Sequence, residues 1–188
     1  MPKITESRIL ILATDGFEKS ELFVPLEKLK EAGAKVVVAA PEKRAIKSWD
    51  KKDWGETIDA DCAAADVDIS DYDALVLPGG QINPDLLRVD TDAMAVVKTF
   101  LKSGKVVAAI CHAPWLLAEA GGLDGRDVTS YPSIKTDLIN AGANWRDAEV
   151  VADKGIVTSR SPKDLDAFVS KIVEEVEEGR HEERKLAA

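Results

Sequence analysis

Short apolar runs alternate along the chain with longer segments of helical periodicity, and this alternation restricts the fold more than any other feature. Continuous runs rich in Val, Ile, Leu and Ala are typical of strands covered on both faces of a sheet. Such strands are predicted at residues 8–14, 36–40, 72–78 and 105–110. Apolar side chains at helical spacing predict helices at residues 20–32, 91–103, 112–120, 133–141 and 162–178. The alternation predicts an α/β fold, with a mostly parallel sheet and helices on both faces.

Three further segments complete the predicted secondary structure. Residues 43–68 are polar and broken by Gly55, which is typical of an excursion from the sheet that holds a small hairpin. Apolar residues at 149–151 and 155–158 flank a short polar turn and predict a second hairpin. A short strand is predicted at residues 128–130.

The length of 188 residues indicates one domain, because the chain is long enough for one well-buried core and too short for two. We expect this domain to span residues 1–188, with a core at about 6–178. The segment 179–188 is rich in Arg, Glu and Lys, so a solvated tail is predicted there.

Composition limits the partners and the location of the protein. The net charge of -9 argues against nucleic acid and against an anionic membrane, because both bind basic surfaces. No apolar run approaches the ~20 residues that span a bilayer, and the segment before Arg8 carries no secretory signal. Cys62 and Cys111 are the only cysteines, so we expect no disulfide framework and a cytoplasmic location.

Cys111 lies where a predicted strand ends and a helix begins, in the run "VVAAICHAPWLL". A sharp turn at this point would raise the side chain above the sheet edge, as in a nucleophile elbow. Ala109 and Ala113 are small enough for such a turn, and Pro114 suits the first turn of a helix. The helix N-terminus is expected to lower the pKa of the thiol. The alternative is that Cys111 is a small buried hydrophobic residue.

A cysteine nucleophile needs a group nearby that exchanges protons with it. His112 is the candidate imidazole, because His181, the only other histidine, lies in the charged tail; packing or capping is the alternative role. Asp15, Glu18 and Glu21 lead into the first predicted helix, and we expect this loop at the same edge of the sheet. One of these carboxyls would become protonated if buried in that cleft, and otherwise each favours the helix dipole.

Gly79 and Gly80 follow a predicted strand and could bring backbone N–H groups close to an oxyanion, although an ordinary turn is the alternative. The chain has no glycine-rich nucleotide-binding motif. Its cysteines and histidines do not recur at the spacing of metal ligands, and Cys62 has no basic neighbour to activate it. We therefore expect no cofactor and no metal.

Four motifs occur in a fixed order: "TDGFEKSEL", "ALVLPGG", "AICHAP" and "VTSRSP". Together they closely resemble the PfpI-type intracellular proteases and the parkinsonism-associated deglycase family. Both belong to the class I glutamine amidotransferase-like superfamily. The resemblance covers about residues 6–178. It implies a flavodoxin-like three-layer α/β sandwich in which Cys111 is the nucleophile at the elbow.

The resemblance also implies roles for other residues. Glu21 matches the carboxyl that hydrogen-bonds the cysteine, and the backbone N–H groups of Gly80 and His112 match the oxyanion site. In the PfpI branch the histidine pairs with an acidic residue of a neighbouring subunit, and the matching position here is Asp85, after a one-residue gap. A homo-oligomer is therefore implied, either a dimer or a hexamer.

Three residues depart from the family pattern. Ala113 stands where Gly is common, Trp115 replaces a common Gln, and Tyr131 occupies a position that is His in the human-type deglycase. The Tyr favours the PfpI branch. The glutamine amidotransferases themselves use Gly-x-Cys-x-Gly and a downstream His-x-Glu. "HEE" at residues 181–183 fits the second pattern but lies beyond the last helix, so we interpret it as chance.

The predicted function is that of a cysteine-dependent hydrolase or lyase acting on small reactive carbonyls or their protein adducts, a deglycase or glyoxalase type of stress protection. An intracellular cysteine peptidase of the PfpI type is the first alternative. A redox-sensing or chaperone-like stress protein that uses Cys111 through oxidation is the second.

Overall fold

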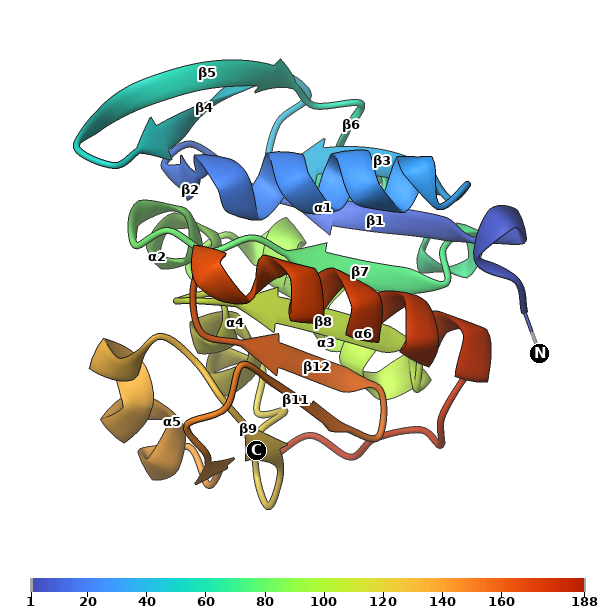
Figure 1. Cartoon of the computed structure of the whole chain (residues 1–188), viewed down its shortest axis with the longest axis vertical. Coiled ribbons are helices and arrows are strands. Elements are labelled where there is room, and N and C mark those ends of the chain that lie inside the picture. The colour runs from blue at the N-terminus through green and yellow to red at the C-terminus, as the bar shows by residue number, and fades with distance from the viewer. Residues whose placement is uncertain (1, 188) are drawn as a thin grey trace.

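Figure 1 shows a computed structural model of the protein, which describes residues 2–187. Its centre is a seven-stranded sheet with the order β11-β12-β8-β7-β1-β3-β6. The strands are β1 (Arg8–Leu12), β3 (Lys35–Ala40), β6 (Cys62–Ala63), β7 (Ala74–Leu77), β8 (Val106–Ile110), β11 (Val150–Asp153) and β12 (Ile156–Ser159). Within this seven-stranded sheet, only the β11–β12 pair is antiparallel. The predicted α/β fold with a mostly parallel sheet is confirmed.

Helices cover both faces of the sheet and make the two outer layers. Helices α1 (Lys19–Glu31) and α6 (Leu165–Glu178) lie on one face, and α3 (Thr91–Ser103) and α4 (Pro114–Glu119) lie on the other (Figure 1). Successive side chains of a strand point to opposite faces, so Ile9 and Ile11 enter the α1–α6 core while Leu10 and Leu12 enter the α3–α4 core. Burial on both faces explains the continuous apolar runs.

The parallel order of β1, β7 and β8 brings three loops to one edge of the sheet. Ile11 pairs with Val76 and Leu77 pairs with Ala109, so the carboxyl ends of these strands lie side by side. Three of the four sequence motifs, "TDGFEKSEL", "ALVLPGG" and "AICHAP", lie at the ends of these strands. This register, rather than closeness in sequence, therefore assembles the candidate site.

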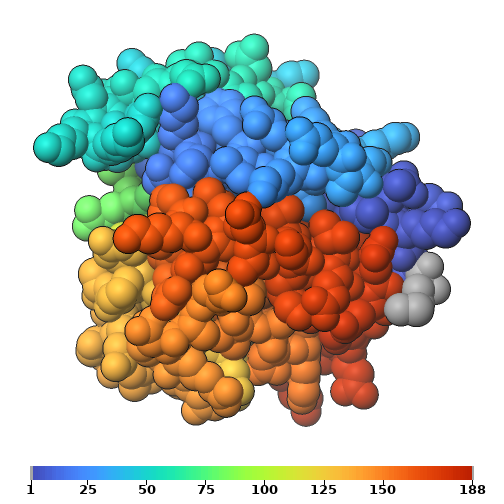
Figure 2. Space-filling view, viewed as in Figure 1, coloured from blue at the N-terminus to red at the C-terminus, as the bar shows by residue number. Residues whose placement is uncertain are grey.

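Both predicted hairpins are present. Strands β4 (Ala45–Asp50) and β5 (Asp53–Asp59) form an antiparallel pair within the excursion, and β11 and β12 form the other. The β4–β5 hairpin lies at the margin of the molecule beside α1 (Figure 2). Its strand β4 pairs with β2 (Phe17–Glu18), the short strand that precedes α1. Helix α6 packs against α1 on the same face of the central sheet.

Several short elements differ from the sequence-based prediction. Strand β9 (Asp127–Val128) is shorter and earlier than predicted, and it pairs with β10 (Asn144–Trp145), which the sequence did not indicate. Helix α5 (Lys135–Asn140) begins later than predicted, because the chain first forms the 3-10 turn η4 (Pro132–Ile134). Helix α2 (Ile82–Leu87) was not predicted. Elements of two to six residues carry too few positions to show a periodicity.

The prediction of a solvated tail is wrong, because the segment after Gly179 is tied down. Arg184 is only 6% exposed, and its guanidinium donates to backbone oxygens of Leu101, Lys105 and Lys154 at 2.7–3.2 Å. The backbone N–H of Ala187 donates to the carbonyl of Gly121 at 2.8 Å. Burial lowers the pKa of Arg184 to about 10, so the side chain is still charged at neutral pH.

We expect Arg184→Ala to lower the free energy of unfolding by about 2–4 kcal/mol, because it removes a buried side chain whose guanidinium donates to three backbone carbonyls. Lys185→Ala is the matched control, since Lys185 is exposed, and it should change stability by less than about 0.5 kcal/mol. Urea unfolding of both variants measures the difference. Equal stabilities would show that the tail contributes nothing.

Within residues 2–187, no helix is both long enough and apolar enough to span a bilayer.

Candidate active site

Cys111 follows β8 directly and adopts a backbone conformation that is rare outside glycine. Its φ is 64°, in the left-handed region where a Cβ atom is crowded. Hydrogen bonds hold the residue there, from its N–H to the carbonyl of Ser159 at 3.0 Å and from the N–H of Tyr131 to its carbonyl at 2.9 Å. Such strain persists only where the surroundings fix it, and it is typical of a nucleophile elbow. The sharp turn predicted at Cys111 is present, and this cysteine is 6% exposed.

Glu21 comes from the first turn of α1, and its carboxyl is fully buried against this elbow. Oε2 accepts a hydrogen bond from the N–H of Gly79 at 3.0 Å, and the carboxyl also contacts the thiol of Cys111. Among residues 2–187, Oε1 has no hydrogen-bond donor. Burial raises the pKa of Glu21 to about 8, so most of the carboxyl is protonated at neutral pH. A protonated carboxyl can donate its hydrogen to a sulfur anion.

Glycine is required at position 79 because the chain passes between Glu21 and Cys111. A Cβ atom at Gly79 would lie 2.4 Å from Glu21 Oε2 and 2.6 Å from Cys111 Cβ. At Gly80, φ is 82°, and a Cβ atom would lie 2.5 Å from the carbonyl oxygen of Gly16. The two glycines therefore let the β7 loop approach the elbow closely.

The ionisation of Cys111 is coupled to that of Glu21. Burial raises the pKa of the thiol, and a negative charge on Glu21 raises it further, whereas the backbone N–H groups of Gly80 and His112 lower it. Burial of the thiol beside Glu21 outweighs the lowering of its pKa that was expected from the helix N-terminus. The two groups cannot both be charged, and at neutral pH both mainly hold their protons, because burial raises the pKa of each. The N–H groups of Gly80 and His112 hydrogen-bond the sulfur and oppose this rise, and they are the donors expected of an oxyanion site.

Glu21 should make stability depend on pH. Its pKa is raised from 4.5 to about 8 by burial, so the folded chain keeps a proton that the unfolded chain releases. The free energy of unfolding is expected to fall from about pH 5 to pH 8, relative to that of Glu21→Gln, by up to about 1.4 kcal/mol per pH unit. Urea unfolding of both proteins at several pH values measures this. A difference that stays constant over that range would mean that Glu21 is already ionised.

His112 is 8% exposed and is surrounded on every side. Its Nδ1 lies 3.2 Å from Cys111 Sγ, and its Nε2 lies 3.1 Å from the hydroxyl of Ser133. The ring of Tyr131 stacks on it at 4.8 Å with an interplanar angle of 24°, and Trp115 meets it edge-on at 5.3 Å. Burial lowers the pKa of His112, so the imidazole is neutral in the resting protein. A neutral imidazole beside a thiol can accept its proton.

The structure does not bring the other predicted carboxyls to the elbow within one chain. Among residues 2–187, no hydrogen bond or ion pair joins Asp85 of α2 to His112, and Asp85 instead lines a pocket of about 310 Å³ beside Trp115. Asp15 pairs with Arg44 at 2.7 Å. Glu18 caps α1, where it accepts from the N–H of Glu21 at 2.9 Å. The pairing of Asp85 across subunits remains a prediction.

Two polar residues at the site were missed. Asn83 is fully buried and links the loops, because it accepts from the N–H of Thr14 at 2.7 Å and donates to the carbonyls of Pro78 and Gly79 at 2.8 and 3.2 Å. Ser133 reaches His112 from the turn η4. Neither had a distinctive sequence signal. Asn83 follows β7, whose carboxyl end lies at this edge, whereas Ser133 follows β9, which is outside the central sheet.

Among residues 2–187, one group of side chains could hold a metal ion, and it lies away from the elbow. The ligand atoms of Glu175, Glu178 and His181 lie within 4.8 Å of one another at the C-terminal end of α6. His181 Nε2 lies 3.0 Å from Glu175 Oε2. Since α6 runs back along the sheet after β12, this end of the helix is at the edge opposite Cys111 (Figure 1). The "HEE" segment therefore has no part in the elbow.

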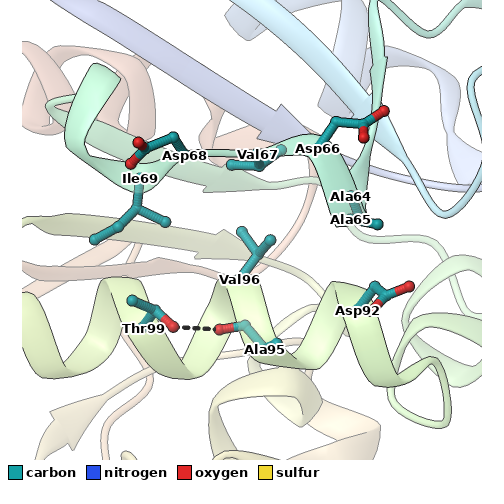
Figure 3. Close-up of a pocket in the computed structure, with 10 residues that line it drawn as sticks. All are labelled: Ala64, Ala65, Asp66, Val67, Asp68, Ile69, Asp92, Ala95, Val96 and Thr99. Atoms are coloured by element: carbon teal, nitrogen blue, oxygen red, sulfur yellow. Dashed lines mark hydrogen bonds between the residues drawn. The ribbon is translucent and has the colours of Figure 1, made fainter.

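A separate hollow of about 500 Å³ lies between α3 and the turns η2 (Ala64–Asp66) and η3 (Ile69–Asp71). Figure 3 shows apolar side chains from both walls, among them Val96 and Ile69, with Asp66, Asp68 and Asp92 at its margin. No cysteine or histidine lines it. This hollow offers no alternative nucleophile, and the elbow remains the candidate active site.

Fold and site together define a flavodoxin-like α/β protein with a buried cysteine in a strained turn after a central strand. Comparison with known proteins then gives the family: residues 7–175 match the model of the DJ-1/PfpI family, and the chain belongs to this family. The family membership predicted from the four motifs is confirmed.

Curated relatives match over most of their own length. Putative cysteine protease YraA of Bacillus subtilis is 48% identical, over 86% of this chain and 93% of the relative. Deglycase PYRAB04690 of Pyrococcus abyssi is 45% identical, over 88% and 97%. Protein/nucleic acid deglycase 2 of Escherichia coli is 42% identical, over 86% and 92%.

Solved structures confirm the flavodoxin-like architecture. DJ-1beta of Drosophila melanogaster superposes with a TM-score of 0.81 at 32% identity, covering 95% of each chain. A two-domain protein of Anabaena variabilis, with DJ-1/ThiJ/PfpI-like and ferritin-like domains, gives a TM-score of 0.85 at 33% identity. The match covers 91% of this chain and 48% of that one.

Proposed function

We propose that the protein is a cysteine-dependent enzyme that converts small reactive carbonyl compounds, such as glyoxal-type aldehydes, or their adducts on amines. The observation that carries the proposal is the contact between the strained Cys111 and the buried, protonated Glu21. Relatives named as deglycases, at 42–45% identity, support this chemistry.

The site supplies what addition to an aldehyde needs. The sulfur of Cys111 bonds to the carbonyl carbon, and the carbonyl electron pair moves to oxygen, which the N–H groups of Gly80 and His112 can stabilise. Protonation of that oxygen gives a hemithioacetal. For a dicarbonyl, transfer of the aldehyde hydrogen as a proton to the neighbouring carbon gives a thioester. Water then releases the hydroxy acid and restores the thiol. Glu21 and His112 are the groups placed to carry these protons.

Burial favours a small substrate. Cys111 is 6% exposed, and the rings of Tyr131 and Trp115 surround the imidazole beside it. A folded protein chain cannot reach the sulfur without movement, whereas a small aldehyde or the end of a modified side chain can. A cysteine peptidase is the second candidate, because a relative at 48% identity carries that name.

Turnover assays of the purified protein separate these candidates. The three substrates are methylglyoxal, a methylglyoxal adduct of an N-acetylated lysine, and a fluorogenic peptide. We expect lactate from the aldehyde, or free amine from the adduct, at rates well above those on the peptide. Peptide hydrolysis without turnover of either carbonyl substrate would replace the carbonyl proposal with the peptidase.

A homo-oligomer, dimer or hexamer, is part of the proposal. Ile82, Leu86 and Val89 are 37–80% exposed on and just after α2, next to the pocket that Asp85 lines, and contact between copies would cover them. Asp85 would then lie near the interface, where it could approach the site of a neighbouring copy. A cytoplasmic location is also proposed, supported by the two free cysteines. Analytical ultracentrifugation of the protein and of Leu86→Glu tests the first point, since the added charge should dissociate the oligomer.

A further inference from the structure

We infer that Ser133 is a positioning residue for His112, and that it holds the imidazole with Nδ1 directed at the thiol of Cys111. The inference rests on the proposed function in one respect only, that Cys111 is the reacting group. Nothing in the family resemblance indicates this serine; the contact itself does.

Contacts at both nitrogens fix the rotation of the ring. Ser133 Oγ lies 3.1 Å from Nε2, and Cys111 Sγ lies 3.2 Å from Nδ1. A half-turn of the imidazole would place carbon atoms where the nitrogens are and would break both contacts. The Ser133 hydroxyl can accept a hydrogen bond from Nε2–H, and in that arrangement Nδ1, the atom that faces the sulfur, presents a lone pair.

The segment that presents Ser133 is fixed to the elbow. The N–H of Tyr131 donates to the carbonyl of Cys111 at 2.9 Å, and the ring of Tyr131 stacks on the imidazole at 4.8 Å. Pro132 begins the 3-10 turn η4, which restricts the backbone between the two side chains. The serine hydroxyl is therefore held at a defined place relative to Cys111 rather than at the end of a mobile loop.

A hydroxyl suits both states of the proton transfer. Neutral His112 with its hydrogen on Nε2 donates to Ser133, which leaves the lone pair of Nδ1 free to accept the thiol proton. After the proton has moved from Sγ to Nδ1, the imidazolium still donates from Nε2 to the same oxygen. No partner has to be exchanged during the transfer. Within one chain, Ser133 thus occupies the position at Nε2 that an acid of a neighbouring subunit would otherwise take.

Imidazole NMR tests the inference without any substrate. The chain has only two histidines, and His181→Gln assigns the second set of ring nitrogens. In the resting protein we expect His112 to carry its hydrogen mainly on Nε2. Ser133→Ala should give a mixture of the two tautomers and lower kcat/KM for methylglyoxal about 3- to 10-fold, the range of one lost hydrogen bond. Ser133→Thr keeps the hydroxyl and should restore both.

Ser133 is exposed, so its loss should not affect folding, and Ser170→Ala on the exposed side of α6 controls for the removal of a surface hydroxyl. An unchanged tautomer in Ser133→Ala would overturn the inference. The inference would also be overturned if Asp85→Asn shifted the His112 signals and Ser133→Ala did not. In that case an acid of the neighbouring subunit would hold the ring. Absence of carbonyl turnover in the wild type would count against the proposed function, and the NMR result would still decide the role of Ser133.

Discussion

Cys111→Ser is expected to reduce the turnover of methylglyoxal by about 10³-fold or more, with little change in stability. Serine matches the size of cysteine and can keep the contact with Glu21, but its hydroxyl loses a proton far less readily than a thiol. Removing a covalent nucleophile leaves only the binding and electrostatic part of catalysis. Steady-state kinetics and urea unfolding of the same preparation separate a catalytic effect from a structural one.

Cys62→Ser is the matched control, because Cys62 is the only other thiol and lies in β6, away from the elbow strand β8. It should retain wild-type turnover. Loss of activity in Cys62→Ser with retention in Cys111→Ser would transfer the chemistry to the other cysteine and contradict the site described above.

Gly79→Ala is expected to lower kcat/KM about 10²-fold and the free energy of unfolding by about 1–3 kcal/mol. The new methyl group would lie 2.6 Å from the carbonyl oxygen of Ile110, in addition to its close approaches to Glu21 and Cys111. Cys111 Cβ and the Ile110 carbonyl cannot move without the backbone, and Glu21 Oε2 is buried and accepts from the N–H of Gly79, so the carboxyl and the elbow must move apart. A displacement of about 1 Å is enough to disrupt a contact on which a reaction depends.

Gly125→Ala separates the clash from the general cost of replacing a glycine. Gly125 has a φ of 68° and nothing within 4 Å of its Cβ position, so alanine there meets backbone strain alone. We expect some loss of stability and unchanged kcat/KM. Similar kinetics for the two variants would mean that the close approach at Gly79 does not support the active site.

The fold could be predicted from the sequence because its signals are long. Strands buried on both faces read as unbroken apolar runs, and α3 was predicted with its observed bounds because 13 residues hold several turns of periodicity. Cys111 could be found in the same way, at the end of an apolar run between two small residues. Glu21 was distinguished from Asp15 and Glu18 only by the family resemblance, because three nearby carboxyls look alike until burial separates them.

What the sequence did not show depends on partners that are distant in the chain. The anchors of Arg184 are backbone carbonyls of residues 101, 105 and 154, and backbone oxygens leave no trace in a sequence. A run of charged residues therefore resembles a solvated tail. The direction of the Cys111 pKa was also mistaken, because the helix N-terminus is visible in the sequence while the burial of the thiol beside a carboxyl is not.

The central claim is that Glu21 keeps its proton and donates a hydrogen bond to the sulfur of Cys111. Its most direct test is the pKa of the Cys111 thiol, from the rate of alkylation by iodoacetamide as a function of pH, in a Cys62→Ser background where Cys111 is the only thiol. Glu21→Leu removes the donor and should raise this pKa, whereas Glu21→Gln keeps an N–H donor and should change it less. A fall in the thiol pKa of Glu21→Leu would mean that Glu21 is charged and repels the thiolate, and it would contradict the account.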